Sequence, residues 1–327
     1  MHKIALVGAG RIGRIHAANI AANPKLRLDC VIDPVADAAN ELASLYGARA
    51  SSLDAALADP DIAGVVIASS TDTHLDYTLA ALRAGKAVFC EKPLDQDLAR
   101  ARAAEAELAA IGGRVLLAFN RRFDPNFALL QQRLAAGDVG ELETLHIISH
   151  DPAPPPAHYI PTSGGLFKDM VIHDFDMARW MLGEDVTQVF ATASVLIDPA
   201  IGEAGDVDTA KTILRTASGK LCMISSSRRS GYGYDQRIEA FGSGGLIRAE
   251  NVLESTVQTW TGAGAGADRL MDFFLDRYAA AYAREMAHFA DVIDGATPLV
   301  GCADGIAALA LAEAAAQSVK SGAFVQV

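Results

Sequence analysis

The sequence predicts an α/β protein of two domains. A doubly wound parallel sheet is expected at residues 1–120, and an α+β domain with a large, mostly antiparallel open sheet at residues 121–327. In the first third, apolar strand-like runs alternate with helical stretches, and a glycine-rich turn joins the first strand to the first helix. Beyond residue 120, strand-like runs follow one another with short turns, which is typical of antiparallel sheets.

The composition is that of an ordinary globular protein, with 51% hydrophobic and 21% charged residues in a chain of 327. The net charge is −12 and Lys and Arg do not cluster, so we expect no nucleic-acid partner. The four cysteines lie far apart without a CxxC pair, which predicts reduced thiols and no metal site. We see no secretory signal pattern and no apolar run long enough for a membrane span, so we expect a cytoplasmic protein.

A glycine motif, G-x-G-x-x-G, follows the first predicted strand (residues 3–7) and precedes a helix that ends at about residue 22. This order is typical of a dinucleotide-binding Rossmann domain. The first glycine permits a tight turn, the second lets the backbone approach a pyrophosphate, and the third allows helix and strand to pack closely. A glycine-rich turn without a ligand is the alternative for the hexapeptide alone. The predicted phosphate-binding residues are Gly8, Gly10, Arg11, Ile12 and Gly13.

The second predicted strand ends at Asp33, before Pro34. A carboxylate at this distance from the glycines accepts hydrogen bonds from the adenosine ribose and repels a 2′-phosphate. The sequence therefore predicts NAD rather than NADP. An ordinary loop acid is the weaker alternative.

The alternation continues with strands expected at residues 64–68, 87–90 and 115–119 and helices at 37–46, 74–84 and 97–111. Ligands of such sheets bind at the carboxyl ends of the strands, where the loops SSTDTH and EKPL lie. These loops predict further cofactor contacts from Ser69, Ser70, Thr71, His74, Glu91 and Lys92.

Lys92 lies between an acid and a proline at one of these strand ends. A lysine there is usually solvated or ion-paired, in this case with Glu91, but it can also hold a positive charge where a substrate oxygen binds. We hypothesise that the Lys92–Pro93 peptide bond is cis, because cis prolyl bonds occur in tight functional turns.

The second domain is expected to begin with a helix after Pro125 and to end with two long helices, at about residues 279–293 and 303–321. Its strands are predicted near residues 143–149, 186–197, 209–217, 220–226, 237–241 and 246–249. The apolar positions around residues 186–197 and 221–224 indicate a sheet face that could pack against another subunit.

The segment GGLFKDMVIHDFDMARWMLG, residues 164–183, predicts an amphipathic helix. At about 100° per residue, Asp169, His173 and Asp176 share one narrow stripe, and most apolar residues share the other side. Asp174 projects into the apolar arc, so we expect it to be buried with a partner such as an Arg, unless the helix is irregular. An ordinary i,i+4 pair of Asp169 and His173 is the alternative to a catalytic role.

With the glycine motif, EKPL and the Asp-His helix in this order, the chain resembles the Gfo/Idh/MocA family of NAD(P)-dependent oxidoreductases along essentially its whole length. The segments FNRRFDPNF, GGLFKDMVIHDFDMARWMLG and GYGYDQRIEAFGS are similar to its inositol dehydrogenase branch. The resemblance implies oxidation of a secondary hydroxyl of a cyclic polyol, with myo-inositol as the first candidate and scyllo-inositol or an aldose as alternatives. It also implies a homotetramer or dimer, and a catalytic set of Lys92, Asp169 and His173.

In this set His173 would act as general base, since a histidine titrates near 6.5, close to neutral pH. Asp169 would orient the imidazole and Lys92 would stabilise developing alkoxide charge. Arg122 pairing with Asp124, and tyrosines packing in the sheet, are alternatives for some of the substrate candidates. A non-catalytic NAD sensor is the competing function of another class. The polyol-binding candidates are Asn120, Arg122, His150, Asp151, Asp176, Tyr232 and Tyr234.

Overall fold

The computed structural model describes residues 1–327, apart from the side chain of residue 157. The chain forms two compact units, the first from Met1–Phe123 with Ala280–Leu309 and the second from Asp124–Ala279 with Ala310–Val327. The first border lies close to the expected division at residue 120. The return of residues 280–309 to the first unit was not expected, because the periodicity of a helix does not reveal which sheet it covers.

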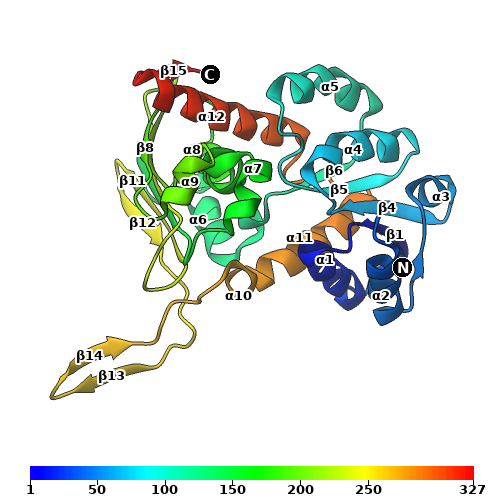
Figure 1. The fold of residues 1–327 in the computed structure, drawn as a ribbon. Helices are drawn as coiled ribbons and strands as arrows, with labels where there is room; N and C mark the ends of the chain where they lie inside the picture. The colour runs from blue at the N-terminus through cyan, green and yellow to red at the C-terminus, as the bar shows by residue number, and fades with distance from the viewer. The chain divides into compact units, whose positions relative to one another are not determined.

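The first unit is built on a six-stranded parallel sheet in the order β3-β2-β1-β4-β5-β6 (Figure 1). Its central strands are almost wholly buried, as expected for parallel strands with helices on both faces. The doubly wound sheet is thus confirmed, although β3 and α3 are too short to be recognised by periodicity. The strands are β1 (His2–Val7), β2 (Leu26–Ile32), β3 (Arg49–Ala50), β4 (Ile62–Ile67), β5 (Ala87–Glu91) and β6 (Val115–Ala118). The helices are α1 (Arg11–Ala22), α2 (Ala36–Leu45), α3 (Leu53–Ala58), α4 (His74–Arg83), α5 (Leu98–Ile111) and α11 (Ala279–Ile293), with 3₁₀ turns η1 (Thr71–Thr73) and η2 (Asn120–Phe123).

Helix α11 packs closely against strand β4. A β-carbon placed on Gly64 would lie 2.9 Å from the Phe289 ring and 3.1 Å from Ile293. Glycine therefore stands in the middle of this strand because the helix needs the space. This contact binds the late segment of the chain to the sheet formed by the first 118 residues.

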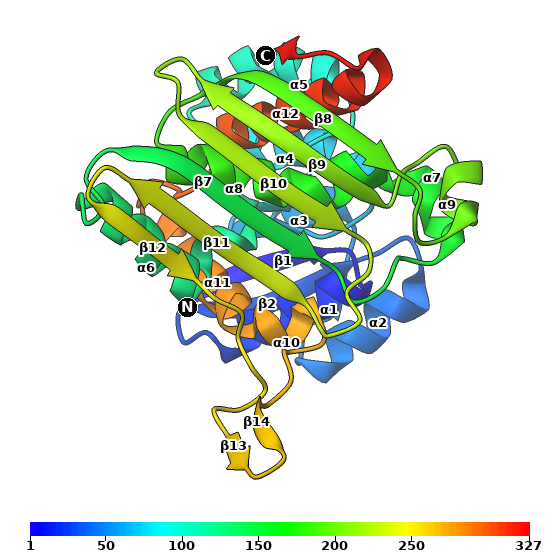
Figure 2. The same cartoon turned by 90° about the vertical axis from the view of Figure 1, so that its left-hand side faces the viewer.

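The second unit contains a seven-stranded sheet in the order β12-β11-β7-β10-β9-β8-β15 (Figure 2). Strands β7 and β10 are parallel and the other pairs are antiparallel, which confirms the mostly antiparallel sheet. Its strands are β7 (Leu142–His150), β8 (Val186–Ser194), β9 (Thr209–Thr216), β10 (Leu221–Ser227), β11 (Asp235–Gly242), β12 (Gly245–Ala249) and β15 (Val325–Gln326). The helical segments are α6 (Pro125–Ala135), η3 (Ala157–Tyr159), α7 (Ile160–Ser163), η4 (Phe167–Val171), α8 (Ile172–Leu182), α9 (Pro199–Glu203), α10 (Phe274–Arg277) and α12 (Cys302–Ser321), which continues from the first unit.

The two faces of this sheet differ in burial. Leu145, Ile147, Cys222 and Ile224 are buried on the inner face, which helix α8 covers (Figure 2). Residues that alternate with them point to the outer face, where Ile213, Leu221, Met223, Phe241 and Leu246 are exposed. A hairpin of β13 (Gln258–Thr261) and β14 (Gly264–Ala267), not expected from the sequence, extends away from the sheet in both views.

The segment expected to be one regular helix has two parts. Residues Phe167–Val171 form a π-helical turn, η4, and α8 follows from Ile172 to Leu182. A π turn closes hydrogen bonds from i to i+5 and is wider than an α turn, so the angular positions calculated for an ideal α-helix do not apply across it. Such turns are frequent at functional sites.

Candidate active site

The glycine turn of the first unit has the geometry that its sequence predicts. Gly8 has φ +105, and a β-carbon there would lie 2.3 Å from the carbonyl oxygen of Ala68. A β-carbon on Gly13 would lie 2.0 Å from the carbonyl oxygen of Gly8, whereas one on Gly10 would meet nothing within 4 Å. Two glycines are therefore required by packing, and the third leaves the backbone accessible. Arg11 and Ile12 form the start of α1 directly after this accessible backbone.

Asp33 is fixed beside the glycine turn. One carboxylate oxygen accepts a hydrogen bond from the backbone N–H of Ala9 (2.7 Å), and the other accepts one from Val35 (2.8 Å). The side chain is only partly buried. The carboxylate is thus held in place with part of its surface open, where the ribose of a dinucleotide would be recognised.

The two predicted loops at the strand ends lie together. The ring of His74 is 2% exposed, with Nδ1 at 2.8 Å from the carbonyl oxygen of Pro93 and Nε2 at 3.2 Å from that of Ser69. His74 therefore joins the loop after β4 to the loop after β5. In the first loop, the hydroxyls of Ser69 and Thr73 are 2.7 Å apart, Ser70 is exposed, and Thr71 opens the η1 turn.

The Glu91–Lys92–Pro93 turn follows β5. The Lys92–Pro93 peptide bond is cis, which confirms the hypothesis from the sequence. Glu91 places Oε1 at 2.7 Å from Nε2 of His16, and its Oε2 accepts a hydrogen bond from the Lys92 backbone N–H at 3.3 Å. Lys92 itself is partly buried.

In the second unit, Asp169 lies in the π-helical turn. Its carboxylate accepts a hydrogen bond from the Tyr159 hydroxyl (3.1 Å) and from both terminal nitrogens of Arg228 (3.3 Å each). Arg228 is 2% exposed and lies just after β10, 3.8 Å from Asp206. Neither Arg228 nor Tyr159 is among the residues predicted from the sequence. The available signal was an Arg directly after the polar strand end SSS, which does not reveal its partner.

Three further polar residues follow on α8. His173 is its second residue and is partly buried, whereas Asp174 and Asp176 are both fully buried. Burial, with a smaller contribution from Asp174, raises the pKa of the Cys222 thiol, which places Asp174 near the inner face of the sheet. The expected burial of Asp174 is thus confirmed, and Asp176 is as deeply enclosed. The roles of Asp169, His173 and Asp176 remain predictions.

The substrate candidates of the first unit are both buried. Asn120 and Arg122 are each 5% exposed in the η2 turn. Arg122 donates to Asp304 (3.0 Å) and to the carbonyl oxygen of Leu299 (3.1 Å). Asp124, the partner suggested for Arg122, instead binds Arg277 through a close buried ion pair.

The remaining candidates are spread over the second unit. His150 alternates with the inner residues of β7, so its side chain is on the outer face, with Nε2 at 2.9 Å from the Ser225 hydroxyl. Burial lowers its pKa. Asp151 follows it, and its N–H donates to the Ser227 carbonyl. The structure therefore does not bring His150 together with the residues of η4 and α8. Two tyrosines complete the set: Tyr232 is 59% exposed and donates to Asp235, and Tyr234 is 7% exposed and packs edge-on against Tyr278.

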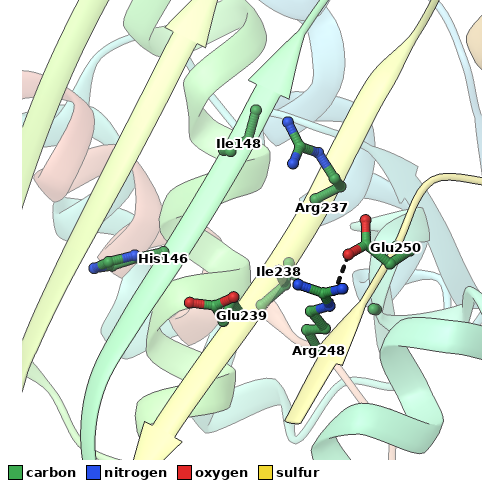
Figure 3. Close-up of a pocket in the computed structure, with 8 residues that line it drawn as sticks. His146, Ile148, Arg237, Ile238, Glu239, Arg248 and Glu250 are labelled. Carbon is green, nitrogen blue, oxygen red and sulfur yellow. Dashed lines mark ion pairs between the residues drawn. The ribbon is translucent and has the colours of Figure 1, made fainter. Parts of the chain in front are cut away.

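A cavity of about 110 Å³ lies on the sheet of the second unit and is distinct from the predicted site (Figure 3). His146, Arg237, Glu239 and Arg248 line it, and Arg248 pairs with Glu250 at 2.7 Å. None of the predicted site residues is part of its lining, so we do not assign the reaction to it.

Two further observations concern metal ligands and membrane-spanning helices among the residues that the structure describes. Among these residues, no three or more His, Cys, Asp or Glu side chains are arranged to hold a metal ion. No helix in the described chain has the length and apolar character that a bilayer crossing requires.

The parallel sheet, its glycine turn and Asp33 define a dinucleotide-binding oxidoreductase fold. Residues 2–119 match the oxidoreductase family with an NAD-binding Rossmann fold, and residues 127–248 match the GFO/IDH/MocA C-terminal domain. The chain belongs to the Gfo/Idh/MocA family. It is thus an oxidoreductase with NAD as its cofactor.

Similar proteins cover its whole length. The chain is 48% identical to the inositol 2-dehydrogenase of Rhizobium meliloti, over 97% of this chain and 96% of that one. A crystal structure of a myo-inositol dehydrogenase from Corynebacterium glutamicum superposes with a TM-score of 0.95 at 44% identity, covering 100% and 99% of the two chains. The scyllo-inositol dehydrogenase of Lactobacillus casei with bound NAD(H) and scyllo-inositol gives a TM-score of 0.92 at 28% identity, with the same coverage.

Proposed function

We propose that this protein is an NAD-dependent inositol 2-dehydrogenase that oxidises the 2-hydroxyl of myo-inositol to 2-keto-myo-inositol (scyllo-inosose). The observation that carries the proposal is 48% identity to an inositol 2-dehydrogenase over almost the full length of both chains. Dehydrogenases named for scyllo-inositol are also similar, at 36% and 28% identity. Scyllo-inositol is therefore the second candidate substrate, followed by an aldose.

The residues of the first unit fit NAD. Gly10 leaves room for a pyrophosphate at the start of α1, and Asp33 is fixed where it can accept hydrogen bonds from the ribose hydroxyls. Bound NAD supplies the acceptor for the hydride that leaves the carbinol carbon. Since the Asp33 carboxylate repels a 2′-phosphate, we expect NADP to be a much poorer cofactor.

The proposed chemistry belongs to three side chains. His173 takes the hydroxyl proton, Lys92 orients the hydroxyl oxygen and stabilises its developing negative charge, and Asp169 sets the electrostatic environment of the imidazole. The buried Arg228 beside Asp169 supports this last role, because its two hydrogen bonds hold the carboxylate in one orientation. A neutral imidazole is needed to accept the proton.

A substrate panel tests the function. We expect NADH absorbance to rise with myo-inositol, more weakly with scyllo-inositol, and least with glucose or other aldoses, when each is supplied at equal concentration with NAD. A higher kcat/KM for scyllo-inositol or an aldose would transfer the assignment to that substrate. Tight NAD binding without turnover on any polyol or sugar would instead favour the sensor.

We also propose that the protein forms a homo-oligomer, a tetramer or a dimer, through the outer face of the seven-stranded sheet. Ile213, Leu221, Met223, Phe241 and Leu246 are each at least 38% exposed there. Light scattering should give an oligomer that Met223→Glu weakens, whereas Leu129→Glu, on the exposed side of α6, should not. A monomeric wild-type protein would contradict this. Its predicted location, the cytoplasm, is a further proposal that cell fractionation can test.

A further inference from the structure

Glu285 is a buried acid that the proposed reaction does not use. It lies on α11 in the first unit, on the helix face that also buries Tyr282, Met286 and Phe289. Its side chain is 0% exposed, and neither carboxyl oxygen has a hydrogen-bond partner among the described residues. An ionised carboxylate in such a place is strongly disfavoured, so the group is expected to keep a proton.

The surroundings of Glu285 connect it to the Lys92 turn. Burial raises the pKa of Glu285 well above its usual value, and the charge of Glu91 raises it further. Glu91 in turn is bound to His16, which is 0% exposed and packs edge-on against Phe89, with ring centroids 4.7 Å apart. Glu91 on β5 is the charged group that acts on Glu285, and His16 on α1 and Tyr282 on α11 are titratable groups of the same region, with their rings 6.0 Å apart.

The two carboxyl groups cannot both be ionised at low cost in this environment. Glu91 is the group with partners for a negative charge, since its oxygens meet the His16 ring and the Lys92 backbone N–H. It is also the more accessible of the two, with 15% of its side chain exposed. The proton is therefore assigned to Glu285.

We infer that Glu285 holds a proton in the folded protein and that its ionisation would displace the Glu91–Lys92 turn, which is a positioning effect on Lys92. The α11 residues on either side of Glu285 place it near the Glu91–His16 pair, because the Tyr282 ring lies 6.0 Å from the His16 ring and the Phe289 ring lies 5.7 Å from the Phe89 ring. The Glu91 carboxylate of this pair is the group that accepts the Lys92 N–H. A second negative charge behind it would push Glu91 away from this contact. The role in catalysis rests on the proposed function, whereas the protonation does not.

The first experiment measures urea unfolding of the full chain between pH 5 and pH 9. Wild type is compared with Glu285→Gln, a neutral residue of the same shape, and with Glu285→Met as a second variant without polar atoms. The unfolded chain releases the proton above about pH 4.5 and the folded chain retains it, so wild type should lose stability relative to both variants as the pH rises. The relative unfolding constant should change up to tenfold per pH unit until Glu285 ionises in the folded protein.

The matched control is Glu105→Gln, the same change at an exposed position on α5. It should follow wild type at every pH. If Glu285→Gln and Glu285→Met also run parallel to wild type, Glu285 is ionised in the folded protein and the inference is wrong.

The second experiment tests the positioning role with NADH affinity, followed by fluorescence, and with kcat/KM for myo-inositol. From pH 7 to pH 9, the NADH affinity and the kcat/KM of wild type should each fall at least threefold more than those of Glu285→Gln. If the pH profiles of NADH affinity and kcat/KM coincide while the unfolding constants differ, Glu285 holds a buried proton but the positioning role is wrong. Absence of polyol turnover in all variants would contradict the proposed function, and the unfolding and NADH results would still decide this inference.

Discussion

The glycine turn of the first unit and the π-helical turn of the second both present polar groups, but different forces hold them. Around Gly8 and Gly13 the constraint is steric, because added β-carbons would lie 2.3 and 2.0 Å from backbone oxygens. Around Asp169 the constraint is electrostatic, because a buried Arg228 and Tyr159 hold one carboxylate. The backbone proposed to recognise phosphate is thus fixed by shape, whereas the carboxylate proposed to act on the imidazole of His173 is fixed by charge.

The largest expected effect comes from removing the proposed base. His173→Ala should lower kcat for NAD reduction by about 10²- to 10⁴-fold, since general bases contribute this much, and should leave NADH affinity near wild type. Steady-state kinetics at saturating substrate measures the first and fluorescence titration the second. His2→Ala, which alters only a surface pair with Asp294, is the control. A rate within about threefold of wild type would remove His173 from the mechanism.

The second-largest effect is expected from removing Arg228. Arg228→Met removes two hydrogen bonds from a buried cation to the Asp169 carboxylate, which is 17% exposed, so we expect a loss of about 3 kcal/mol in unfolding free energy and a reduced kcat. Asp169→Asn in the same chain should recover part of the stability but not the rate. The neighbouring Arg229 is exposed, and Arg229→Met should change neither quantity. Equal behaviour of the two arginine variants would show that charge does not hold this turn.

The difference between the two regions also explains what the sequence could predict. Gly13 packs against Gly8, Gly8 packs against the end of β4, and Gly10 stays accessible between them, so the spacing of the three glycines indicates their geometry. Arg228 meets Asp169 across 59 positions, and that contact depends on where β10 ends. Periodicity cannot reveal such a partner.

Three placements that the sequence did not indicate have the same origin. His150 is a predicted substrate residue, and the alternation of β7 places its side chain on the outer face of the sheet, which its motif does not indicate. The angles calculated across Asp169 and His173 assumed an α-helix, whereas a π turn lies there. Arg122 pairs with Asp304 rather than with Asp124, because residues 280–309 return to the first unit. Each depends on tertiary structure that short-range spacing does not contain.

Two glycine variants test the steric part of the comparison. Gly13→Ala should lower the unfolding free energy by about 1 to 3 kcal/mol, because its β-carbon would meet the backbone of Gly8 at 2.0 Å. Gly10→Ala meets nothing within 4 Å and should leave stability within about 0.5 kcal/mol, while weakening NADH binding because the methyl occupies the phosphate approach. Chemical denaturation and NADH titration separate the two effects. If both variants lost stability equally, steric packing would not distinguish the two glycines.

The smallest expected effect is on stability at low pH. It tests whether electrostatic contacts hold buried carboxylates in the second unit. Asp235 is fully buried; burial opposes its ionisation, but hydrogen bonds from Arg237, Asn251 and Tyr232 lower its pKa from 3.8 to about 2. Its folded pKa is below the unfolded value, so its contribution is present above about pH 4 and is lost as the pH falls toward 2. Between pH 6 and pH 3, wild type should therefore lose about 1 kcal/mol that Asp235→Asn does not lose. The control is Asp272→Asn, at an exposed position of the same unit, which should follow wild type. An identical pH dependence of stability in all three proteins would show that the partners of the Asp235 carboxylate do not stabilise its ionised form.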